Sequence, residues 1–323
     1  MNRKTRALIL AAGKSKRMKS DKSKILHKIL GKTIIEHVVD ALDIDEVDRI
    51  AIVVSDDNYR EIQQVCGKRV DYIIQDKQLG TGHAVMVSAD WLKKFSGNLI
   101  VYVGDAPFLD RKVTKNLLNN FDKGKNTATL LTAIYDNPPP YGRIVRDRNN
   151  KIIRIVEEKD ATEEEKKIKE VSSSHYCFDK EKLFSALNQI DNDNAQNEYY
   201  LPDVIEILIN NNEKIEAFVV DNPIVTFGIN NRNDLSKGIK YLQQKIINYW
   251  LDNAVTIIDP DTTYIDATVK IEKDTIIHPF TYLSDFTQIG TQSEIGPFVR
   301  ISGEKLASNS KVAWQNIKNI EQY

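Results

Sequence analysis

The sequence predicts an α/β protein that has a mostly parallel sheet, one connecting helix and a short C-terminal left-handed parallel β-helix. Three observations support this fold class. Short Val- and Ile-rich runs alternate with helical patterns in the first half, as is typical of a parallel sheet covered on both faces. A long amphipathic segment begins near residue 233. Beyond it, aliphatic residues recur at every sixth position, the spacing of a hexapeptide-repeat β-helix.

Four short apolar runs in the first half have the composition of buried strands, and they are residues 7–10, 49–54, 70–74 and 98–103. The segments between them have helical spacing over residues 33–42, 57–66 and 82–95. In a parallel α/β sheet, ligands bind beyond the carboxyl ends of the strands. The loops that follow residues 10 and 103 are therefore expected at the ligand-binding edge.

The middle of the chain, residues 127–220, is less regular. It contains three consecutive prolines at 138–140, a charge-rich stretch at 157–170 and a polar run at 191–198. These segments interrupt the strand and helix patterns on either side. We interpret them as insertions that form the acceptor side of a cleft.

Residues 233–252 have one apolar stripe at helical spacing, formed by Leu235, Ile239, Leu242, Ile246 and Trp250. A helix that connects two domains has this pattern. The predicted domains are therefore residues 1–232 and 253–323, with the helix of residues 233–252 between them.

The tail has a period that neither a helix nor a simple strand produces. Seven aliphatic residues follow one another at six-residue steps, namely Ile265, Ile271, Ile277, Leu283, Ile289, Ile295 and Ile301. Three such steps make one coil of a hexapeptide β-helix, so the tail has roughly two and a third coils. The register slips near Leu306 and Val312. The alternative is a β-rich appendage of another kind.

Composition and charge exclude several classes of protein. A net charge of -1 gives no electrostatic footprint for nucleic acid or an anionic membrane. Two cysteines, Cys66 and Cys177, are too few for a disulfide framework and are expected to be reduced and buried. The apolar run at residues 7–12 is too short for a signal peptide or a membrane span. These features favour the cytoplasm.

The loop after the first strand has features of a phosphate site. Leu10, Ala11, Ala12 and Gly13 form a turn of small residues, and residues 14–28 hold seven Lys or Arg and one acid. Small residues let a ligand approach the backbone, and unpaired N–H groups there attract anions. The loop has neither the Walker A pattern nor the three glycines of a dinucleotide fingerprint. By local charge alone, a solvated basic loop explains it equally well.

The same stretch carries a family resemblance. Leu10-Ala11-Ala12-Gly13, Arg17-Met18 and Lys24 resemble the signature of the sugar-1-phosphate nucleotidyltransferases, and residues 24–32 and later segments are similar to the bacterial N-acetylglucosamine-1-phosphate uridyltransferases. Those enzymes are usually bifunctional, with a C-terminal acetyltransferase. The resemblance implies a Rossmann-like nucleotidyltransferase domain. It also implies Mg²⁺-dependent transfer of a uridylyl group from UTP to N-acetylglucosamine-1-phosphate, with release of pyrophosphate.

The resemblance assigns the reacting groups. Arg17 and Lys24 are the implied catalytic cations, since guanidinium and ammonium groups spread the charge of phosphoryl transfer. Asp105 and Asn230 are the implied Mg²⁺ ligands, and one carboxylate and one amide suffice because Mg²⁺ also takes phosphate and water oxygens. Taken alone, Asp105 is equally well read as a turn or helix cap.

The implied nucleotide-binding residues are Leu10, Ala11, Ala12, Gly13, Gln75, Gly80, Thr81 and Gly104. Gln75 and the segment from Gly80 to His83 resemble the part of the family that reads uracil with an amide and backbone groups. We expect His83 to cap or pack rather than to catalyse.

The implied sugar-binding residues are Gly142 and Glu157. Here the chain departs from the family, which has Asn-Thr-Gly where residues 172–174 are Ser-Ser-Ser, and Gly where this chain has Asn197. The loss of an amide partner at a sugar hydroxyl costs about 1–3 kcal/mol when the partner stays buried. Another hexose-1-phosphate is therefore an alternative substrate.

The tail departs from the family as well. No histidine follows His278, whereas the family's acetyltransferase uses a catalytic histidine, so neither acetyl transfer nor an acetyl-CoA site is expected. A short β-helix of this type implies a homotrimer. Two other classes are alternatives: a non-catalytic sugar-nucleotide sensor or scaffold, and a nicotinamide oxidoreductase, whose glycine fingerprint this chain lacks.

Overall fold

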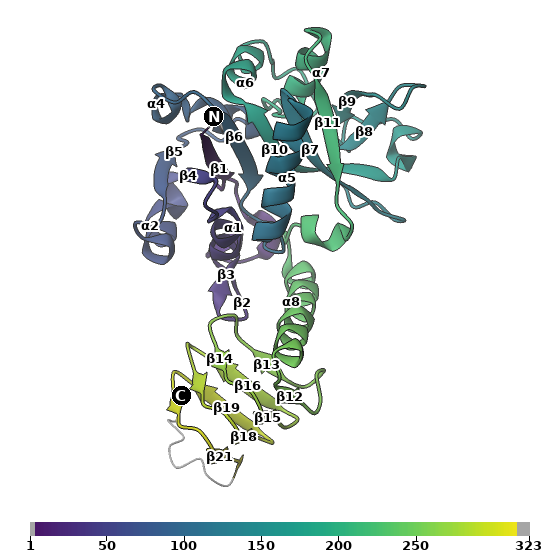
Figure 1. Cartoon of the computed structure of the whole chain (residues 1–323). Helices are drawn as coiled ribbons and strands as arrows, with labels where there is room; N and C mark the ends of the chain where they lie inside the picture. Colours follow the sequence, from purple (N-terminus) through teal and green to yellow (C-terminus); the bar gives the residue numbers. More distant parts are fainter. Residues whose placement is uncertain (1–3, 315–323) are drawn as a thin grey trace. The chain divides into compact units, whose positions relative to one another are not determined.

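The computed structural model describes residues 4–314 (Figure 1). The chain forms two compact units. The first unit is Met1–Leu26 with Ile34–Ile229, and the second unit is His27–Thr33 with Asn230–Tyr323. Among the helices of residues 4–314, none combines the length and the apolar character needed to cross a membrane. The predicted three-part division of the chain stays a prediction.

A nine-stranded sheet forms the first unit, with strand order β11-β7-β10-β6-β1-β4-β5 and with β8 and β9 attached beside β10. Strands β1, β4, β5 and β6 run parallel, and β10 runs antiparallel to β6 and β7. The strands are β1 Thr5–Leu10, β4 Val47–Val54, β5 Asp71–Ile74, β6 Asn98–Val103, β7 Ala128–Ile134, β8 Arg143–Arg146, β9 Ile152–Val156, β10 Glu170–Asp179 and β11 Ile215–Val219. This sheet confirms the predicted α/β class, and its first four strands match the four apolar runs.

Helices cover the sheet. They are α1 Ile34–Leu42, α2 Asp56–Cys66, α3 Thr81–Met86, α4 Ala89–Leu92, α5 Arg111–Gly124, α6 Lys180–Leu187 and α7 Asp203–Asn210, with short 3-10 turns at Lys16–Met18, Lys24–Leu26, Glu165–Lys167 and Pro223–Thr226. Helix α5 lies across β7 and β10 (Figure 1). The single helix expected over residues 82–95 is two short helices, because the buried Ser88 hydroxyl donates to the carbonyl of Val85 at 2.6 Å and interrupts the pattern.

The middle segment contributes more to the sheet than the sequence pattern predicts. Strand β7 is buried along most of its length, and β10 is the antiparallel strand between β6 and β7. A register shift lies between Ser172 and His175 of β10. Much of residues 127–220 is therefore part of the main sheet, and only portions of it line a cleft.

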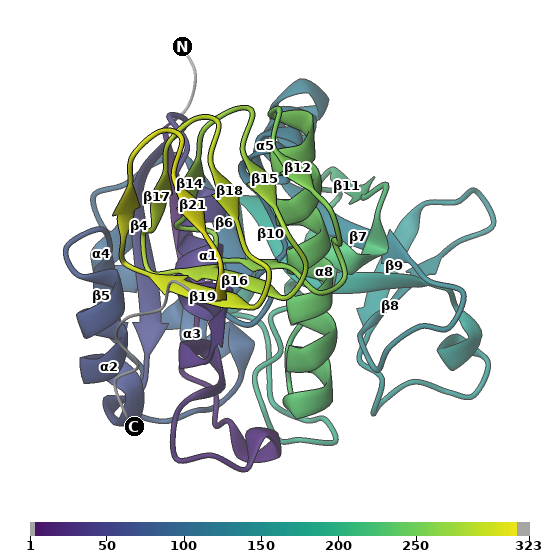
Figure 2. The same ribbon diagram turned by 90° about the horizontal axis from the view of Figure 1, so that it is seen from below.

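The second unit combines a long helix, a hairpin and a parallel β-helix. Helix α8 is Arg232–Asp252, and its N-terminus is capped reciprocally by Asn231 and Asp234. The β-helix strands form three parallel stacks, β12-β15-β18-β21, β13-β16-β19 and β14-β17-β20 (Figure 2). Their bounds are β12 Thr256–Ile257, β13 Tyr264–Ile265, β14 Lys270–Ile271, β15 Ile276–Ile277, β16 Thr281–Ser284, β17 Gln288–Ile289, β18 Glu294–Ile295, β19 Val299–Ser302, β20 Lys305–Leu306 and β21 Lys311–Val312.

All seven aliphatic residues of the six-residue repeat are buried inside this β-helix. Successive coils align residues 18 apart, as Tyr264 does with Tyr282. In the last coil the offset becomes 17, so that Ile295 pairs with Val312. The predicted β-helix and the register slip are both present, and the alternative of another β-rich appendage is wrong.

The sequence pattern did not predict the hairpin of β2, Lys28–Ile29, and β3, Lys32–Thr33. It belongs to the second unit, where the N–H of Ala267 donates to the carbonyl of Leu30 at 2.9 Å. Gly31 at its turn has φ +88°, and a Cβ there would lie 2.8 Å from the Cβ of Asp266. Only glycine fits this contact without strain.

Candidate active site

The loop after β1 continues the hydrogen bonding of the sheet before it leaves the edge. The N–H of Ala11 donates to the carbonyl of Val53 at 2.9 Å, and the N–H of Gly104 donates to the carbonyl of Leu10 at 2.9 Å. A buried side chain adds a further contact, since the Asn58 amide donates to the carbonyl of Ala11 at 2.9 Å. A Cβ at Gly13 would meet nothing within 4 Å, so the backbone there is open to a ligand.

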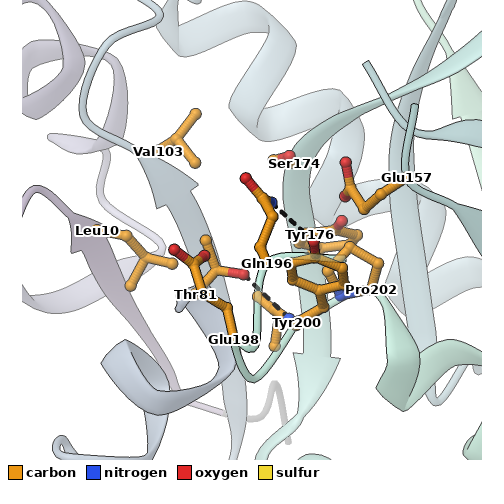
Figure 3. A pocket seen from close by; sticks show the side chains of 11 residues that line it. Leu10, Thr81, Val103, Glu157, Ser174, Tyr176, Gln196, Glu198, Tyr200 and Pro202 are labelled. Atoms are coloured by element: carbon orange, nitrogen blue, oxygen red, sulfur yellow. Dashed lines mark hydrogen bonds between the residues drawn. The ribbon is translucent and has the colours of Figure 1, made fainter. Parts of the chain in front are cut away.

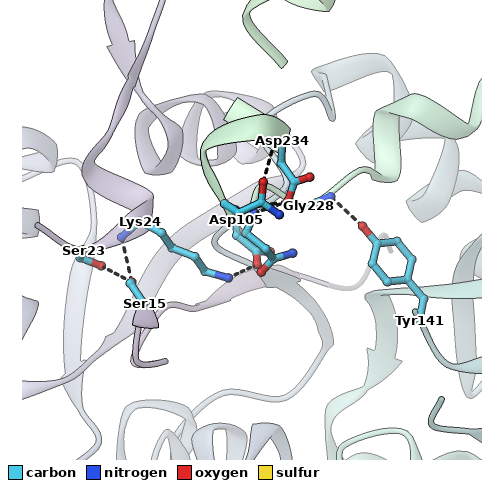
Figure 4. Close-up of polar contacts among 9 residues, drawn as sticks. Ser15, Ser23, Lys24, Asp105, Tyr141, Gly228 and Asp234 are labelled. Carbon is cyan, nitrogen blue, oxygen red and sulfur yellow. Dashed lines mark hydrogen bonds and ion pairs between the residues drawn. The ribbon is translucent and has the colours of Figure 1, made fainter. Parts of the chain in front are cut away.

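The basic loop is held in a defined conformation. Met18 is completely buried, which anchors the first 3-10 turn. The N–H of Lys24 donates to the Ser15 hydroxyl at 2.8 Å, and that hydroxyl lies 3.4 Å from the hydroxyl of Ser23 (Figure 4). These hydrogen bonds fix the loop and hold Lys24 and the exposed Arg17 near the strand ends. A basic loop that only served solubility would not need such a fixed conformation.

Lys24 and Asp105 form an ion pair between the ammonium nitrogen and Oδ2 (Figure 4). Each side chain is 19% exposed, so the pair is partly shielded from water. The backbone beneath it is fixed, because the N–H of Ile229 donates to the carbonyl of Asp105 at 2.8 Å. The Tyr141 hydroxyl accepts from the N–H of Gly228 at 2.8 Å and holds the same segment.

Asn230 follows Ile229 directly and is the first residue of its segment of the second unit. Its N–H donates to a carboxylate oxygen of Asp234 at 3.0 Å. The predicted pairing of Asn230 with Asp105 around a metal stays a prediction. Asp105 itself fits Mg²⁺ chemically, because a partly shielded carboxylate is a hard oxygen ligand.

A cleft of about 1000 Å³ lies along the strand ends of the first unit. It gathers all eight predicted nucleotide-binding residues, both predicted catalytic cations, Asp105 and Glu157. In full, its lining is Leu10, Ala11, Ala12, Gly13, Lys14, Arg17, Lys24, Ile25, Gln75, Gln78, Gly80, Thr81, Ala84, Val103, Gly104, Asp105, Pro140, Glu157, Glu158, Lys159, Gln196 and Glu198. A cleft that brings together open backbone, two cations and a carboxylate can bind a triphosphate with its metal.

One side of the cleft is formed by the segment after β5. Gln75 is only 3% exposed, and its N–H donates to the carbonyl of Val54 at 2.8 Å. Gly80 has φ +107°, and a Cβ there would lie 2.5 Å from the carbonyl oxygen of Tyr199. The Thr81 hydroxyl accepts from the N–H of Leu201 at 3.0 Å. Residues near 80 and near 200 therefore form one wall.

A recess of about 180 Å³ shares six lining residues with the cleft and adds Ser174, Tyr176 and Tyr200 (Figure 3). The Gln196 amide donates to the Tyr200 hydroxyl at 2.7 Å across it. Hydroxyls, an amide and the carboxylates of Glu157 and Glu198 line this space beside the apolar side chains of Leu10, Val103, Leu201 and Pro202. Such a mixed lining can bind a polyhydroxylated ring.

The pKa of Glu157 is raised from 4.5 to about 7, chiefly by burial and also by the negative charges of Asp203 and Asp160, with Arg143 acting in the opposite direction. Gly142 does not line the cleft, but a Cβ at its position would lie 3.4 Å from Oε1 of Glu157. The two predicted sugar-binding residues are therefore neighbours.

The three serines that replace the family's Asn-Thr-Gly lie at the register shift of β10. The Ser172 hydroxyl is 3.1 Å from the hydroxyl of Tyr176, and the Ser173 hydroxyl donates to the carbonyl of Leu131 at 2.6 Å. Ser174 has φ +58° and lines the recess. The protein thus uses two of the hydroxyls internally, and Ser174 alone is a residue of the recess.

Sequence reasoning missed several residues of the site. The sequence identifies the segments as cleft insertions or family matches, but it assigns no binding role to the individual residues Ser174, Gln196, Glu198 and Tyr200. Their spacing carries no motif, because loops and the irregular part of β10 bring them together. His83, expected to cap or pack, contacts the side chain of Gln75 through its ring nitrogen.

Comparisons with known proteins agree with this geometry. The family model described as nucleotidyl transferase matches residues 6–253. The bifunctional protein GlmU of Limosilactobacillus reuteri is 41% identical over 320 residues, which are 99% of this chain and 70% of that protein. The protein of the same name from Thermoanaerobacter pseudethanolicus is 44% identical over 311 residues, 96% of this chain and 67% of that protein. The one from Clostridium acetobutylicum is 42% identical over 306 residues, 95% of this chain and 67% of that protein.

Proposed function

We propose that this chain, which belongs to the nucleotidyl transferase family, transfers the uridylyl group of UTP to N-acetylglucosamine-1-phosphate and releases pyrophosphate. The observation that carries the proposal is the cleft of the first unit, where the strand-end loop, Arg17, Lys24 and Asp105 share one lining with Glu157. The relatives named bifunctional protein GlmU, at about the same identity along nearly the whole chain, support the same reaction.

The phosphate chain lies against the loop of residues 11–13 in this proposal, where the backbone of Gly13 is open. The Arg17 guanidinium gives forked hydrogen bonds to phosphate oxygens, and the Lys24 ammonium gives a compact charge near the α-phosphate. Protein groups in phosphoryl transfer mainly hold the reactants in line and stabilise spread negative charge. The hydrogen bond between Ser15 and the backbone of Lys24 serves this purpose because it fixes the position of the lysine before the substrate binds.

The proposed metal is Mg²⁺, with Asp105 as its carboxylate ligand and Asn230 as the second protein ligand. When bound, Mg²⁺ neutralises the charge of the triphosphate. The Asp105 carboxylate suits it because its backbone is fixed by Ile229 and its oxygens lie at the cleft lining. Removal of divalent metal with a chelator is expected to abolish turnover, and added Mg²⁺ is expected to restore it.

The sugar occupies the recess in this proposal, with Glu157 and the backbone of Gly142 facing its hydroxyl groups. The serines at 172–174 favour a second candidate, the same transfer to another hexose-1-phosphate. Ser174 offers one hydroxyl to the recess, whereas the family has Gly at that position and an amide two residues earlier. The two candidates share every step on the nucleotide side.

Pyrophosphate release from UTP and Mg²⁺ tests both candidates when N-acetylglucosamine-1-phosphate, glucose-1-phosphate and glucosamine-1-phosphate are compared. The highest kcat/KM with the first sugar supports the main proposal. The highest kcat/KM with another of these sugar phosphates would support the same reaction on a different sugar substrate. Tight UTP binding without turnover on any of the three would instead identify a sensor.

Three further properties belong to this proposal. These 323 residues do not transfer acetyl groups, since no histidine follows His278. The β-helix mediates assembly of a homotrimer, which light scattering measures directly. The protein works in the cytoplasm, in keeping with buried, unpaired Cys66 and Cys177.

A further inference from the structure

We propose that His83 is a positioning residue that makes the cleft select uracil over cytosine, by fixing the orientation of the Gln75 side-chain amide. This inference rests on the proposed uridylyl transfer and concerns the nucleotide side of the same cleft. It gives a role to a histidine that neither touches phosphate nor catalyses a step.

The amide of Gln75 occupies an almost completely buried position at the end of β5. The residue is 3% exposed and lines the cleft, and its own N–H is bonded to the carbonyl of Val54. A buried amide must satisfy both its donor and its acceptor groups. The atoms around Gln75 therefore decide which of the two it presents to a ligand.

Two acceptors surround the amide nitrogen of Gln75. Nε2 lies 3.4 Å from the carbonyl oxygen of Gly80 and 2.8 Å from Nδ1 of His83. A carbonyl can only accept, so the amide must direct its nitrogen and not its oxygen toward Gly80. The two Nε2 hydrogens are then used by Gly80 and His83, which requires the ring proton of His83 to be on Nε2. The oxygen Oε1 of Gln75 is the group that remains for the cleft.

The ring of His83 is well placed to hold this orientation because the start of α3 cannot shift. The N–H of Gly82 donates to the carbonyl of Tyr199 at 2.7 Å. A Cβ at Gly82 would lie 2.6 Å from Cδ1 of Ile190, so the helix start is in close contact with its neighbours. His83 is therefore a fixed acceptor, unlike a side chain on a mobile loop.

An acceptor in the cleft distinguishes the two pyrimidines. Uracil has an N–H at ring position 3, which can donate to Oε1 of Gln75, whereas cytosine has a lone pair there and repels it. Cytosine would be accepted only if the amide turned over and presented Nε2. Turning over would require the other ring tautomer of His83 and would place Oε1 against the carbonyl of Gly80, which is unfavourable.

Equilibrium binding of UTP and CTP in the presence of Mg²⁺ tests the inference in the full chain. His83→Phe keeps a ring of similar size and removes the acceptor. We expect it to lower the ratio of UTP to CTP affinity by about fivefold to tenfold, the loss that corresponds to one hydrogen bond. His83→Asn should retain most of the ratio, because its Oδ1 is an acceptor close to the position of Nδ1. His278→Phe, in the second unit, is the matched control and should leave the ratio unchanged.

The outcomes separate a positioning role from a structural one. A wild-type UTP to CTP ratio in His83→Phe overturns the inference, and so does an equal loss of affinity for both nucleotides. A wild-type protein that binds the two nucleotides equally also overturns it. Failure of wild-type turnover with every sugar phosphate would refute the proposed function alone, since the binding ratio is measured without turnover. The KM for the sugar-1-phosphate should not change in any variant.

Discussion

At the base of the cleft, Lys24 and Asp105 neutralise each other in a partly shielded position. Their attraction is stronger than that of a surface pair because each side chain is 19% exposed. Removal of either group breaks this ion pair and also removes a group that is proposed to act on the triphosphate or its metal. The two side chains are thus coupled in both stability and chemistry.

Substitution of this pair is expected to abolish most of the activity. Lys24→Ala and Asp105→Asn should each lower kcat by at least about 100-fold, the usual loss of one group that stabilises transition-state charge. Lys22→Ala, an exposed lysine of the same loop that does not line the cleft, should keep wild-type kcat. Pyrophosphate release at saturating substrates is the measurement. Normal turnover in Asp105→Asn would exclude the assigned metal ligand.

Glu157 is expected to make sugar affinity depend on pH. Its pKa is raised to about 7, and only the ionised carboxylate accepts hydrogen bonds from two sugar hydroxyls at once. The KM for the sugar-1-phosphate should therefore fall more steeply in the wild type than in Glu157→Gln as the pH rises through about 7. The phosphate group of the substrate titrates equally in assays of both proteins. The ratio of the wild-type KM to the variant KM therefore reports only the titration of the Glu157 side chain. A ratio independent of pH would remove Glu157 from the sugar site.

The same shift has a consequence for folding. An acid with a raised pKa binds its proton more tightly in the folded protein than in the unfolded chain. Its contribution to stability is present below the unfolded pKa near 4.5 and is lost as the pH rises through about 7. The free energy of unfolding, measured in urea, should thus decrease as the pH rises over this range. The decrease should be smaller in Glu157→Gln than in the wild type. An equal decrease in both proteins would contradict the assignment.

Among the secondary-structure elements, the irregular part of β10 and the β2–β3 hairpin carry the largest departures from simple patterns. The register shift of β10 puts Ser174 in a left-handed conformation at the recess. The hairpin contacts the β-helix through Gly31 and Leu30, although the tail begins more than two hundred residues later in the chain. In both places the local backbone conformation depends on contacts with residues that are distant in the sequence.

Gly31→Ala is expected to destabilise the second unit. The positive φ costs about 1 kcal/mol for any residue with a Cβ, and the clash with Asp266 adds a comparable amount. Gly303→Ala is the matched control, because Gly303 lies in the same unit and also has a positive φ (+72°), but a Cβ there would be 3.6 Å from its nearest neighbour, the carbonyl oxygen of Asp285. The difference in unfolding free energy between the two variants measures the contact. Equal losses would show that the hairpin moves away from Asp266 freely.

At the scale of the whole molecule, each unit has a hydrophobic core of its own. One cluster of buried side chains surrounds β1, β6 and β10, and another fills the β-helix and includes Ile247 of α8. The lining of the cleft belongs entirely to the first unit, and Asn230 of the second unit enters only as the proposed second ligand of Mg²⁺. A ligand that binds in the cleft should therefore shift the unfolding transition of the first unit. A substitution in the tail should shift the unfolding transition of the second unit.

Calorimetry with two perturbations tests this independence. UTP with Mg²⁺ at a hundred times its Kd should stabilise the first unit by about 2.7 kcal/mol. Ile295→Ala, in the β-helix core, should destabilise the second unit by about 2–4 kcal/mol and leave UTP affinity unchanged. Loss of UTP binding in Ile295→Ala would mean that the cleft depends on the tail.

The fold class and most of the nucleotide side followed from the sequence alone. Continuous apolar runs predict strands of a parallel sheet because both of its faces must be buried, and the six-residue repeat predicts a β-helix because each step places one aliphatic residue inside. The positions of Leu10 to Gly13 and of Asp105 follow from strand ends, whereas the roles of Arg17 and Lys24 were implied by the family resemblance. Parallel strands end at one edge, so local position was enough to bring these residues together.

Only the tertiary structure decided the remaining features. The split of the helix over residues 82–95 depends on the buried hydroxyl of Ser88, and the hairpin at residues 28–33 depends on Asp266, which is far away in sequence. Ser174, Gln196 and Tyr200 meet in one recess because loops and a register shift converge there. The bond between His83 and Gln75 likewise arises from packing against Tyr199. The contacts of the hairpin and of the recess have no spacing in the sequence, because their partners are set by the packing of distant segments and not by the period of a helix or strand.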